Sequence, residues 1–389
     1  MKKIITGQFS DAIPPITDGV AFVAQNYYHY LNLKYGSSYL IGPDGPKDAD
    51  EASSVIRFKS YEIPGFHPYR VGVPLLGTFR SALDSIDFDI IHSHTPFTAG
   101  HEAFRIAKRK NIPIIGTFHS KYKDDFAKAL KSMTLSEQVV KYVVHYYEKM
   151  DQVWVPNEQT KEVLFSYGYQ GNVEIVHNGT EMELLDEKSH TFLREKGRKE
   201  HGIGDDEILL LYVGQMREEK NLFFLINSIQ QMHKEHLPIK VIFIGAGRDE
   251  DELKGRVHQK GLDSIFTFTG LIRDRKVLQS YFAMSDLYTF PSLYDNSSLT
   301  MKEAATCALP TIVIQGSTTS EGIIDEGNGF LIEHNVSSFV SKVKYLIEHP
   351  DIIKKAGLGA KNTLYISYES IVDEVYERYI KIIHDKTKK

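Results

Sequence analysis

The sequence predicts an α/β protein with two Rossmann-like, doubly wound domains that face each other across a cleft. Short runs rich in β-branched residues alternate with amphipathic helical patterns, which is typical of parallel sheets joined by crossover helices. A chain of 389 residues is long enough for two domains, each with its own core. The stretch 181–206 is polar and helix-breaking, so we expect the domain junction there.

Each half of the chain is expected to form one sheet. The expected strands are 3–6, 39–41, 90–92, 112–117, 152–155 and 173–176 in the first half, and 208–213, 239–244, 266–269, 287–290 and 311–314 in the second. The domains are expected at 1–185 and 186–364, and a last helical pattern at 365–389 is expected to cross back to the first domain. Ligands of such sheets bind beyond the carboxyl ends of the strands, so the loops there are the candidate sites.

Composition excludes several classes of protein. The single cysteine, Cys307, rules out an internal disulfide and a cysteine-based zinc site, and it suits a reducing cytoplasm. The apolar run among the first residues is too short for a signal peptide. The sequence contains no run of eighteen apolar residues, so we expect no membrane span. A net charge of -5 gives no reason to expect nucleic acid. We expect a cytoplasmic protein.

The segment 291–310 is the most informative about function. Asp295 and Glu303 lie on either side of the expected start of a helix. A helix N-terminus offers backbone N–H groups to an anion, and the carboxylates can accept hydrogen bonds from hydroxyl groups around that anion. A phosphate flanked by sugar hydroxyls is a nucleotide sugar. The alternative is structural, because Thr300 and Glu303 also fit a capping box and 295–298 has the composition of an ordinary turn.

Glycine-containing turns follow several expected strands. Gly19 stands at a helix entrance, where glycine lets the backbone approach a phosphate, although a plain turn explains it equally. Gly214 is followed by Arg217 and Lys220, which can reach a diphosphate from a helix N-terminus or form a solvated face.

Two further groups have the residue types of a metal site. Asp249 and Asp251 follow the turn at Gly247, but acids in a first helical turn need only the helix dipole to explain them. His92 and His94 end one expected strand, and no third ligand is apparent nearby. We therefore expect no metal at either place.

His119 follows the expected strand 112–117. It lies at the exit of a buried strand, where active-site residues gather in this architecture, and a hydrogen-bonded core histidine is the alternative.

Taken in order, these motifs resemble the retaining family-4 glycosyltransferases of GT-B fold over nearly the whole chain. Within that family, the segments 117–125 and 298–304 are most similar to bacterial enzymes that glucosylate diacylglycerol. The motifs that carry the resemblance are Asp11, Pro15, Gly19 and Val20; 90–97 with Thr117 to His119; Val213 and Gly214 with Lys220 and Asn221; Phe268 to Gly270; and Asp295 with Glu303.

The resemblance implies transfer of a hexose, glucose above all, from a UDP-sugar to an acceptor hydroxyl with retention of configuration. It implies that the first domain serves the acceptor and the second binds the nucleotide sugar, with no cofactor and no metal. The acceptor would be diacylglycerol or another glycolipid or glycan. The implied catalytic residues are His119, Lys220 and Asp295, and the implied donor-binding residues are Gly19, Gly214, Arg217, Gly247, Gly270, Asn296, Ser297, Ser298, Leu299 and Glu303.

Two positions depart from the family's pattern. Asp295 stands where Glu is usual, and Gln215 where Arg is usual, with Arg217 as a possible source of the missing charge. These departures leave open a non-catalytic nucleotide-sugar-binding protein, or a transferase that acts on a soluble or polysaccharide acceptor. A dinucleotide-dependent oxidoreductase is disfavoured, because the first turn lacks the G-x-G-x-x-G pattern.

The segment 105–131 carries eight Lys or Arg residues against Asp124 and Asp125. With its interleaved aromatic residues it could lie on the inner, anionic face of a membrane, or it could be a solvated basic helix. The candidate membrane or acceptor residues are Arg109, Lys110, Lys121, Tyr122 and Lys128.

Overall fold

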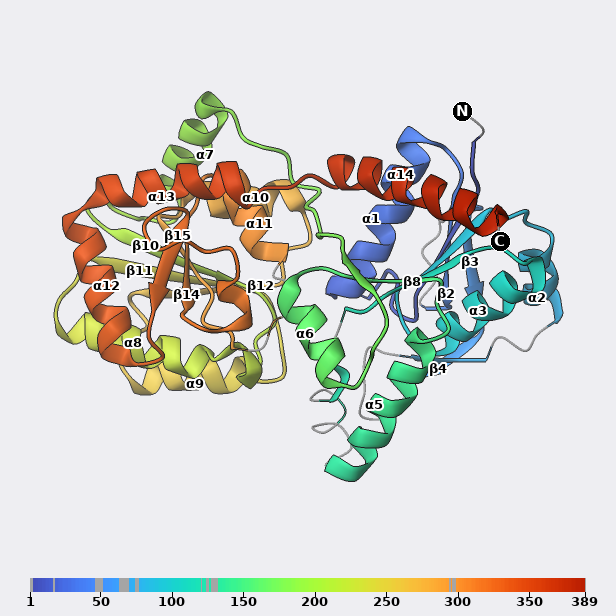
Figure 1. The fold of residues 1–389 in the computed structure, drawn as a ribbon. Coiled ribbons are helices and arrows are strands. Elements are labelled where there is room, and N and C mark those ends of the chain that lie inside the picture. The colour runs from blue at the N-terminus through green and yellow to red at the C-terminus, as the bar shows by residue number, and fades with distance from the viewer. Residues whose placement is uncertain are drawn as a thin grey trace. The chain divides into compact units, whose positions relative to one another are not determined.

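The computed structural model describes residues 3–16, 18–45, 52–62, 70–73, 77–119, 121–123, 126, 132–293, 295 and 299–388. The chain divides into two compact units (Figure 1). Unit 1 comprises Met1–Asn178 and Tyr368–Lys389, and unit 2 comprises Gly179–Ser367. The chain therefore passes between the units near 178 and 367, and not at the expected positions 185 and 364.

Unit 1 contains a parallel sheet of seven strands in the order β3-β2-β1-β6-β7-β8-β9. Its strands are β1 (Thr6–Phe9), β2 (Ser38–Pro43), β3 (Val55–Phe58), β6 (Ile90–Ser93), β7 (Ile114–Thr117), β8 (Gln152–Val155) and β9 (Val173–Ile175), and β4 (Ser60–Glu62) pairs antiparallel with β5 (Arg70–Gly72). Its helices are α1 (Gly19–Lys34), α2 (Gly77–Asp84), α3 (Thr98–Lys110), α5 (Met133–Tyr147), α6 (Glu158–Ser166) and α14 (Tyr368–Thr387).

Unit 2 contains a parallel sheet of six strands in the order β12-β11-β10-β13-β14-β15. In Figure 1, α7 and α10 lie on one face of this sheet, and α8 and α9 on the other. The strands are β10 (Ile208–Val213), β11 (Ile239–Ile244), β12 (Phe266–Gly270), β13 (Leu287–Thr289), β14 (Thr311–Ile314) and β15 (Gly329–Ile332). The helices are α7 (Glu187–Glu200), α8 (Leu222–Lys234), α9 (Glu250–Gln259), α10 (Arg275–Met284), α11 (Leu299–Thr306), α12 (Val336–Glu348) and α13 (Pro350–Thr363), with short 3-10 turns η1 (Glu218–Lys220) and η2 (Thr318–Ser320).

The two parallel sheets confirm the expected fold class, but three local predictions were wrong. The stretch 181–206 contains helix α7, which begins where the Asp186 side chain accepts a hydrogen bond from Ser189 N. The first strand lies at Thr6–Phe9 and not at 3–6, because its ladder begins where Thr6 pairs with Ser38 and Ile90. Strands β3 and β15 were not expected at all.

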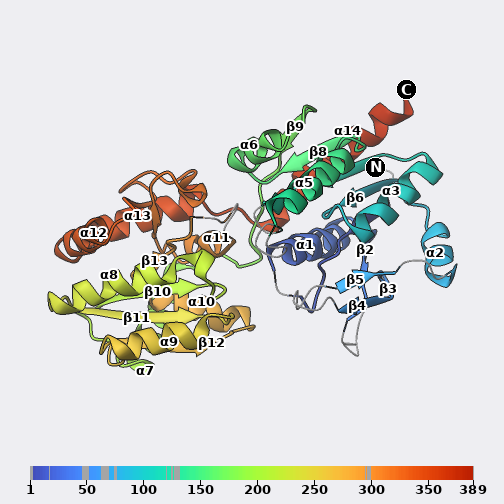
Figure 2. The same ribbon diagram turned by 90° about the horizontal axis from the view of Figure 1, so that it is seen from below.

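The C-terminal helix α14 packs on unit 1 beside α1 (Figures 1 and 2). The ring of Tyr376 stacks on that of Tyr35, with their centroids 3.7 Å apart. Lys34 Nζ lies 2.6 Å from an oxygen of Asp373. Helix α14 thus supplies side chains to the core of unit 1, and one of them, Tyr379, is fully buried there.

None of the helices in the described part of the chain combines the length and the apolar character that crossing a membrane requires.

Candidate active site

The turns after β10, β11 and β12 come together at the carboxyl end of the unit 2 sheet. Gly245 has φ +136°, and a Cβ there would lie 1.9 Å from the carbonyl oxygen of Gly214. A Cβ on Gly247 would lie 2.1 Å from the carbonyl oxygen of Met216. Gly245 N donates a hydrogen bond to Gly270 O at 2.9 Å. Glycine is required here because backbone packs directly on backbone, and the predicted donor residues Gly214, Gly247 and Gly270 all belong to this set of adjoining turns.

Lys220 and Asp295 form an ion pair at this end of the sheet. Lys220 ends the 3-10 turn η1, and its Nζ lies 5.8 Å from the centroid of the Phe290 ring. Both side chains remain partly exposed, Lys220 at 19% and Asp295 at 23%. Only Oδ1 of Asp295 takes part in the ion pair, and Oδ2 is buried without a hydrogen-bond partner within the described residues. The pair therefore keeps one acceptor atom unused.

The loop that carries Lys220 is held in place by the next loop of the sheet. Glu218 N donates to Asp249 Oδ2 at 2.5 Å, and Arg248 forms an ion pair with Glu219 at 2.9 Å. Asp249 thus anchors the Lys220 loop, and Asp251 lies in the first turn of α9. In the described part of the chain, no group of three or more His, Cys, Asp or Glu side chains is arranged to hold a metal ion.

Glu303 lies on α11 and is 6% exposed. Its Oε1 forms an ion pair with Arg275, whose Nε lies 2.7 Å from Glu181 Oε1. Burial raises the pKa of Glu303, and the adjacent Arg275 opposes that rise. Glu303 Oε2 is buried and has no hydrogen-bond partner among the described residues. Glu303, like Asp295, therefore has one carboxylate oxygen without a partner in the described part of the chain.

The capping-box alternative for Thr300 and Glu303 is wrong. Helix α11 begins at Leu299, so Thr300 lies inside it, and the Glu303 side chain pairs with Arg275 instead of the backbone at the helix start. Thr300 Oγ1 lies 2.6 Å from the hydroxyl of Tyr288, which donates to Val213 O at 3.0 Å. This bridge ties the first turn of α11 to the end of β10.

Arg275 and Glu181 were not singled out from the sequence. Arg275 is the first residue of α10, next to the N-cap residue Asp274. The helix dipole disfavours a cation in the first turn of a helix. The unusual position of Arg275 was therefore the one feature of the sequence that could have drawn attention to it. Glu181 lies in a segment with no regular secondary structure, so nothing in the pattern indicated it.

The structure gives fewer contacts for the other residues predicted to bind the nucleotide-sugar donor. Arg217 is partly buried, and within the described residues its guanidinium has no ion-pair or hydrogen-bond partner. Tyr212 donates to the carbonyl oxygen of Gln215 at 2.8 Å, which fixes the backbone at this departure from the family pattern. Leu299 is the first residue of α11. Asn296, Ser297 and Ser298 lie outside the described residues.

In unit 1, His119 follows β7 as expected and is 8% exposed. His119 Nε2 lies 3.2 Å from His94 Nδ1, and the rings of His94 and His92 stack with centroids 4.3 Å apart. Burial lowers the pKa of His119 to about 3 and lowers those of His92 and His94 well below their usual value. All three rings are therefore neutral near pH 7, and His92 and His94 use both ring nitrogens in hydrogen bonds.

Two residues of the first matched motif also lie in unit 1. Gly19 is the first residue of α1, after the N-cap residue Asp18, and among the described residues nothing lies within 4 Å of the position that a Cβ would take there. Asp11 is partly buried, accepts a hydrogen bond from Thr95 Oγ1 at 2.6 Å and accepts a second one from Ala99 N at 2.9 Å. Asp11 therefore holds the start of α3.

The structure changes the interpretation of the basic segment. Arg109 pairs with Asp84, and Lys110 Nζ lies 2.9 Å from the carbonyl oxygen of Asp84, so two of the candidate membrane cations bind α2 or the turn after it. Tyr122 is 5% exposed and packs edge-on against Phe97, so it is a core residue, and its prediction as a membrane contact was wrong. Lys121 is described and Lys128 lies outside the described residues.

Comparison with known proteins identifies the relatives of both units. Residues 17–184 match the model for Glycosyltransferase Family 4, and residues 194–363 match that for Glycosyl transferases group 1. An alpha-monoglucosyldiacylglycerol synthase of Acholeplasma laidlawii is 24% identical over 98% of this chain and 98% of its own length. The enzyme of the same name from Streptococcus pneumoniae is 26% identical over 97% of this chain and 86% of its own length. The crystal structure of Anabaena HepE in complex with UDP and glucose superposes with a TM-score of 0.72 and 15% identity, over 97% of this chain and 98% of HepE.

Proposed function

The chain belongs to the family-4 glycosyltransferases of GT-B fold, and we propose that it transfers glucose from UDP-glucose to an acceptor hydroxyl with retention of configuration. The observation that carries this proposal is the pair of half-used carboxylates at the carboxyl end of the unit 2 sheet. Asp295 and Glu303 each hold one oxygen in an ion pair and leave the other without a partner in the described chain. Hydroxyl groups of a nucleotide sugar supply the donors that these oxygens lack.

The proposed roles follow from position and charge. Glu303 accepts hydrogen bonds from the ribose hydroxyls, and Asp295 from the ring hydroxyls of the sugar. When the donor binds, Lys220 weakens its ion pair with Asp295 and neutralises charge on the diphosphate. A cation held in place where charge develops contributes on the order of a hundred- to thousand-fold in rate. His119 and Gly19 lie in unit 1, and their contacts with the donor stay predictions from the sequence.

The reaction breaks the bond between the sugar C1 and the diphosphate oxygen, and its electron pair leaves with UDP. The acceptor oxygen forms its bond to C1 on the same face, and its proton passes to the departing phosphate. Since Lys220 and the N-terminus of α11 neutralise the phosphates, this scheme needs no metal. UDP release should therefore persist after treatment with EDTA, and a requirement for Mg²⁺ or Mn²⁺ would contradict the scheme.

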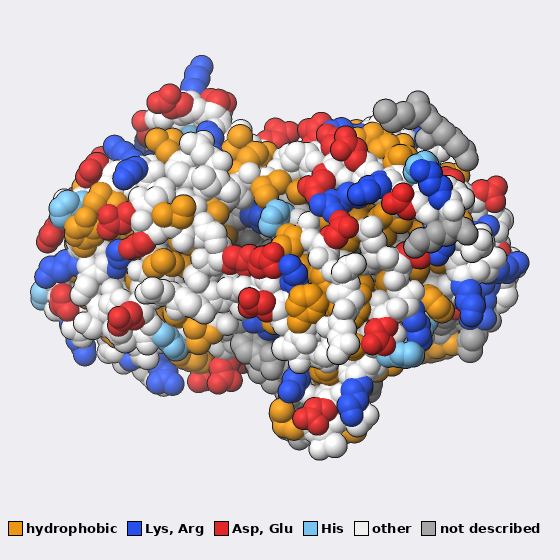
Figure 3. All heavy atoms as spheres, in the orientation of Figure 1, with side chains coloured by type: hydrophobic (Ala, Val, Ile, Leu, Met, Phe, Trp, Pro, Cys, Tyr) orange, Lys and Arg blue, Asp and Glu red, His pale blue; other side chains and the backbone are white. Residues whose placement is uncertain are grey.

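We further propose that the acceptor is diacylglycerol, supported by the two relatives named alpha-monoglucosyldiacylglycerol synthase. A lipid acceptor requires contact with a membrane surface. Acidic and basic side chains are interspersed on the face in Figure 3, and Arg109 and Lys110 already contact α2 or its following turn. We therefore place the contact at the start of α5, where Met133 is 58% and Leu135 53% exposed.

The deciding experiment measures UDP formed from UDP-glucose, with and without vesicles that contain diacylglycerol and an anionic lipid. Release that depends on diacylglycerol supports the full proposal. Release without that dependence keeps the transferase and gives it a soluble or polysaccharide acceptor. UDP binding without release under any condition would overturn the proposal in favour of a nucleotide-sugar-binding protein, an outcome that the departures at Asp295 and Gln215 would then explain.

A further inference from the structure

Asn221 follows Lys220 directly and adopts a backbone conformation that most residues avoid. It closes the turn η1 and is the N-cap residue of α8, with φ +59° and ψ +33° in the left-handed region. A residue with a β-carbon is strained there, although asparagine tolerates the strain better than most, and glycine would avoid it. The side chain at this position is therefore kept against some strain, and the contacts of its amide explain why.

The side-chain nitrogen of Asn221 contacts two other loops of unit 2. Nδ2 lies 3.2 Å from the carbonyl oxygen of Pro291 and 2.9 Å from Nε2 of His334. Pro291 lies two residues after β13, in the segment that leads to Asp295, and His334 lies two residues after β15. These two contacts, the Asn221 bridge, therefore connect the loops that follow β10, β13 and β15.

The contact with Pro291 fixes the direction in which the Asn221 amide points. A carbonyl oxygen can only accept, so the Asn221 atom that faces it must be the nitrogen. His334 Nε2 faces the same nitrogen, which can only donate, so Nε2 must carry a lone pair. A neutral histidine with a lone pair on Nε2 holds its proton on Nδ1. The bridge therefore requires the form of His334 that is protonated on Nδ1.

The packing of two helices holds His334 in place. Its ring packs edge-on against that of Phe224 on α8, with centroids 5.0 Å apart. Phe224 packs in the same way against Phe339 on α12, at 6.1 Å. The next residue in the chain, Asn335, caps α12 by accepting a hydrogen bond from Ser338 N at 2.8 Å. The acceptor nitrogen of the bridge is thus fixed by both α8 and α12.

Two further contacts join the Lys220 loop to the segment after β13. Ser292 Oγ donates to the carbonyl oxygen of Glu219 at 3.4 Å, and Lys220 forms its ion pair with Asp295. The first contact is long for a hydrogen bond from a hydroxyl group. The second weakens in the proposed mechanism when the donor binds. The Asn221 bridge involves neither of these contacts, so it can hold the two loops together at that stage.

We propose that Asn221 and His334 are positioning residues that hold the Lys220 loop against the segment of Asp295 while Lys220 turns to the diphosphate. Asn221 joins the two loops, and His334 supplies the acceptor that fixes the Asn221 amide. Without the bridge, the Lys220 ammonium group is less well aimed at the diphosphate. This role in donor binding rests on the proposed function, whereas the bridge itself and the proton position on His334 do not.

The proton position can be measured on the full chain without substrate. With ¹⁵N-labelled histidine, long-range ¹⁵N–¹H correlation spectra distinguish protonated from unprotonated ring nitrogens, and His334→Gln identifies the signals of His334. At about pH 8, where an ordinary imidazole is neutral, we expect a protonated Nδ1 and an unprotonated Nε2. Asn221→Asp replaces the donor by an acceptor, so the proton should move to Nε2. A wild-type His334 with its proton on Nε2, or one that Asn221→Asp leaves unchanged, would overturn the proposal.

Substitutions at both ends of the bridge connect it to the donor. Asn221→Gly keeps the left-handed backbone and removes only the side chain, so the fold should be retained. We expect UDP affinity and kcat/KM for UDP-glucose each to fall about tenfold, because a misplaced cation loses much of its effect. His334→Leu should give the same loss. His334→Gln should regain most of it, since the glutamine oxygen can accept from Asn221.

The matched control is Asn111→Gly. Asn111 is also an asparagine in the left-handed region, with φ +52°, and it ends α3 in unit 1. Its substitution should change neither UDP affinity, nor turnover, nor the His334 signals. Equal effects of Asn221→Gly and Asn111→Gly, or of His334→Leu and His334→Gln, would reduce the bridge to a structural contact and refute the proposal. If the wild-type protein binds no UDP at all, the proposed function fails instead, and the His334 spectra still decide whether the bridge exists.

Discussion

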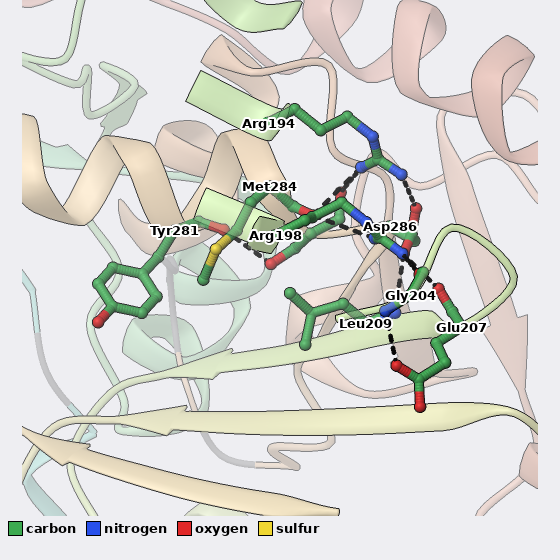
Figure 4. Close-up of polar contacts among 9 residues, drawn as sticks. Arg194, Arg198, Gly204, Glu207, Leu209, Tyr281, Met284 and Asp286 are labelled. Atoms are coloured by element: carbon green, nitrogen blue, oxygen red, sulfur yellow. Dashed lines mark hydrogen bonds and ion pairs between the residues drawn. The ribbon is translucent and has the colours of Figure 1, made fainter. Parts of the chain in front are cut away.

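The unit 2 sheet carries a cluster of charged residues at each end, and the two clusters differ in how many of their polar atoms have hydrogen-bond or ion-pair partners. At the amino end, Asp286 accepts Arg194 at 2.5 Å and Arg198 at 2.9 Å, and its Oδ2 also receives Leu209 N at 2.7 Å (Figure 4). Arg194 Nη1 and both terminal nitrogens of Arg198 donate to backbone carbonyl oxygens, including that of Glu207 at 2.7 Å. At the carboxyl end, Asp295 Oδ2 and Glu303 Oε2 are buried without partners among the described residues.

This difference separates a structural cluster from a candidate binding site. A buried polar atom without a partner costs about 1–3 kcal/mol, so a cluster that serves stability alone satisfies all its atoms. The amino-end cluster meets that condition and joins α7 to the starts of β10 and β13. The carboxyl-end cluster does not, which is understandable if a ligand supplies the missing donors. We therefore expect substitutions at the amino end to lower stability, and substitutions at the carboxyl end to lower turnover or ligand binding.

The largest effect is expected at the amino end. Asp286→Ala leaves Arg198, whose side chain is 7% exposed, buried without its carboxylate. Removal of one partner from a buried ion pair costs about 3–5 kcal/mol, so the denaturant midpoint should fall sharply. The control is Glu200→Ala on the same helix α7, where the partner Lys196 lies 3.9 Å away and both side chains are more than half exposed. Equal stability of the two variants would remove the structural role from the Asp286 cluster.

The next effect is expected at the carboxyl end and concerns turnover. Lys220→Ala should lower UDP release by about a hundred- to thousand-fold, because the diphosphate loses its cation. Unfolding should change little, since both Lys220 and Asp295 are partly exposed. Lys254→Ala is a matched control: Lys254 also pairs with a carboxylate, Glu250, and also lies over a phenylalanine ring, that of Phe268, at 5.7 Å. Near-normal turnover in Lys220→Ala would contradict the proposed site.

A smaller effect is expected from Arg275→Ala, and it depends on pH. Burial already raises the pKa of Glu303, and Arg275 opposes that rise, so its removal should raise the pKa further. Glu303 binds hydroxyl groups as a carboxylate, so UDP affinity in the variant should weaken as the pH falls, by about tenfold at the acid end. Arg275→Lys should restore part of the affinity. Titration of UDP into the three proteins at several pH values measures this, and parallel pH profiles would exclude a role for Arg275 through Glu303.

The two ends also differ in how well the sequence predicted them. The turn glycines, Lys220, Asp295 and Glu303 were found because they follow strand ends in a recognisable order. Asp286 and Arg198 left no such signal, since they meet only when α7 packs against the turn before β13, and α7 itself fell in a stretch predicted to lack a helix. Arg275 was missed for the same reason: its partner Glu303 is distant in sequence and is brought near by the packing of α10 on α11. Patterns along the chain identify strands and turns, whereas contacts between elements need the folded protein.

The smallest effect comes from the same substitution made at both ends. Asp286→Glu adds a methylene to a cluster in which every carboxylate oxygen is already matched, so it should cost about 1–3 kcal/mol of unfolding free energy through overpacking. Asp295→Glu adds the same methylene to a carboxylate with an unused oxygen and 23% exposure, so stability should hardly change. It also restores the residue usual in the family, and turnover should change only a few-fold. The test measures thermal unfolding of both variants and UDP release by Asp295→Glu. If Asp295→Glu were as destabilising as Asp286→Glu, the carboxyl-end cluster would be as tightly fixed as the amino-end one, and its unmatched oxygens could no longer be assigned to a ligand.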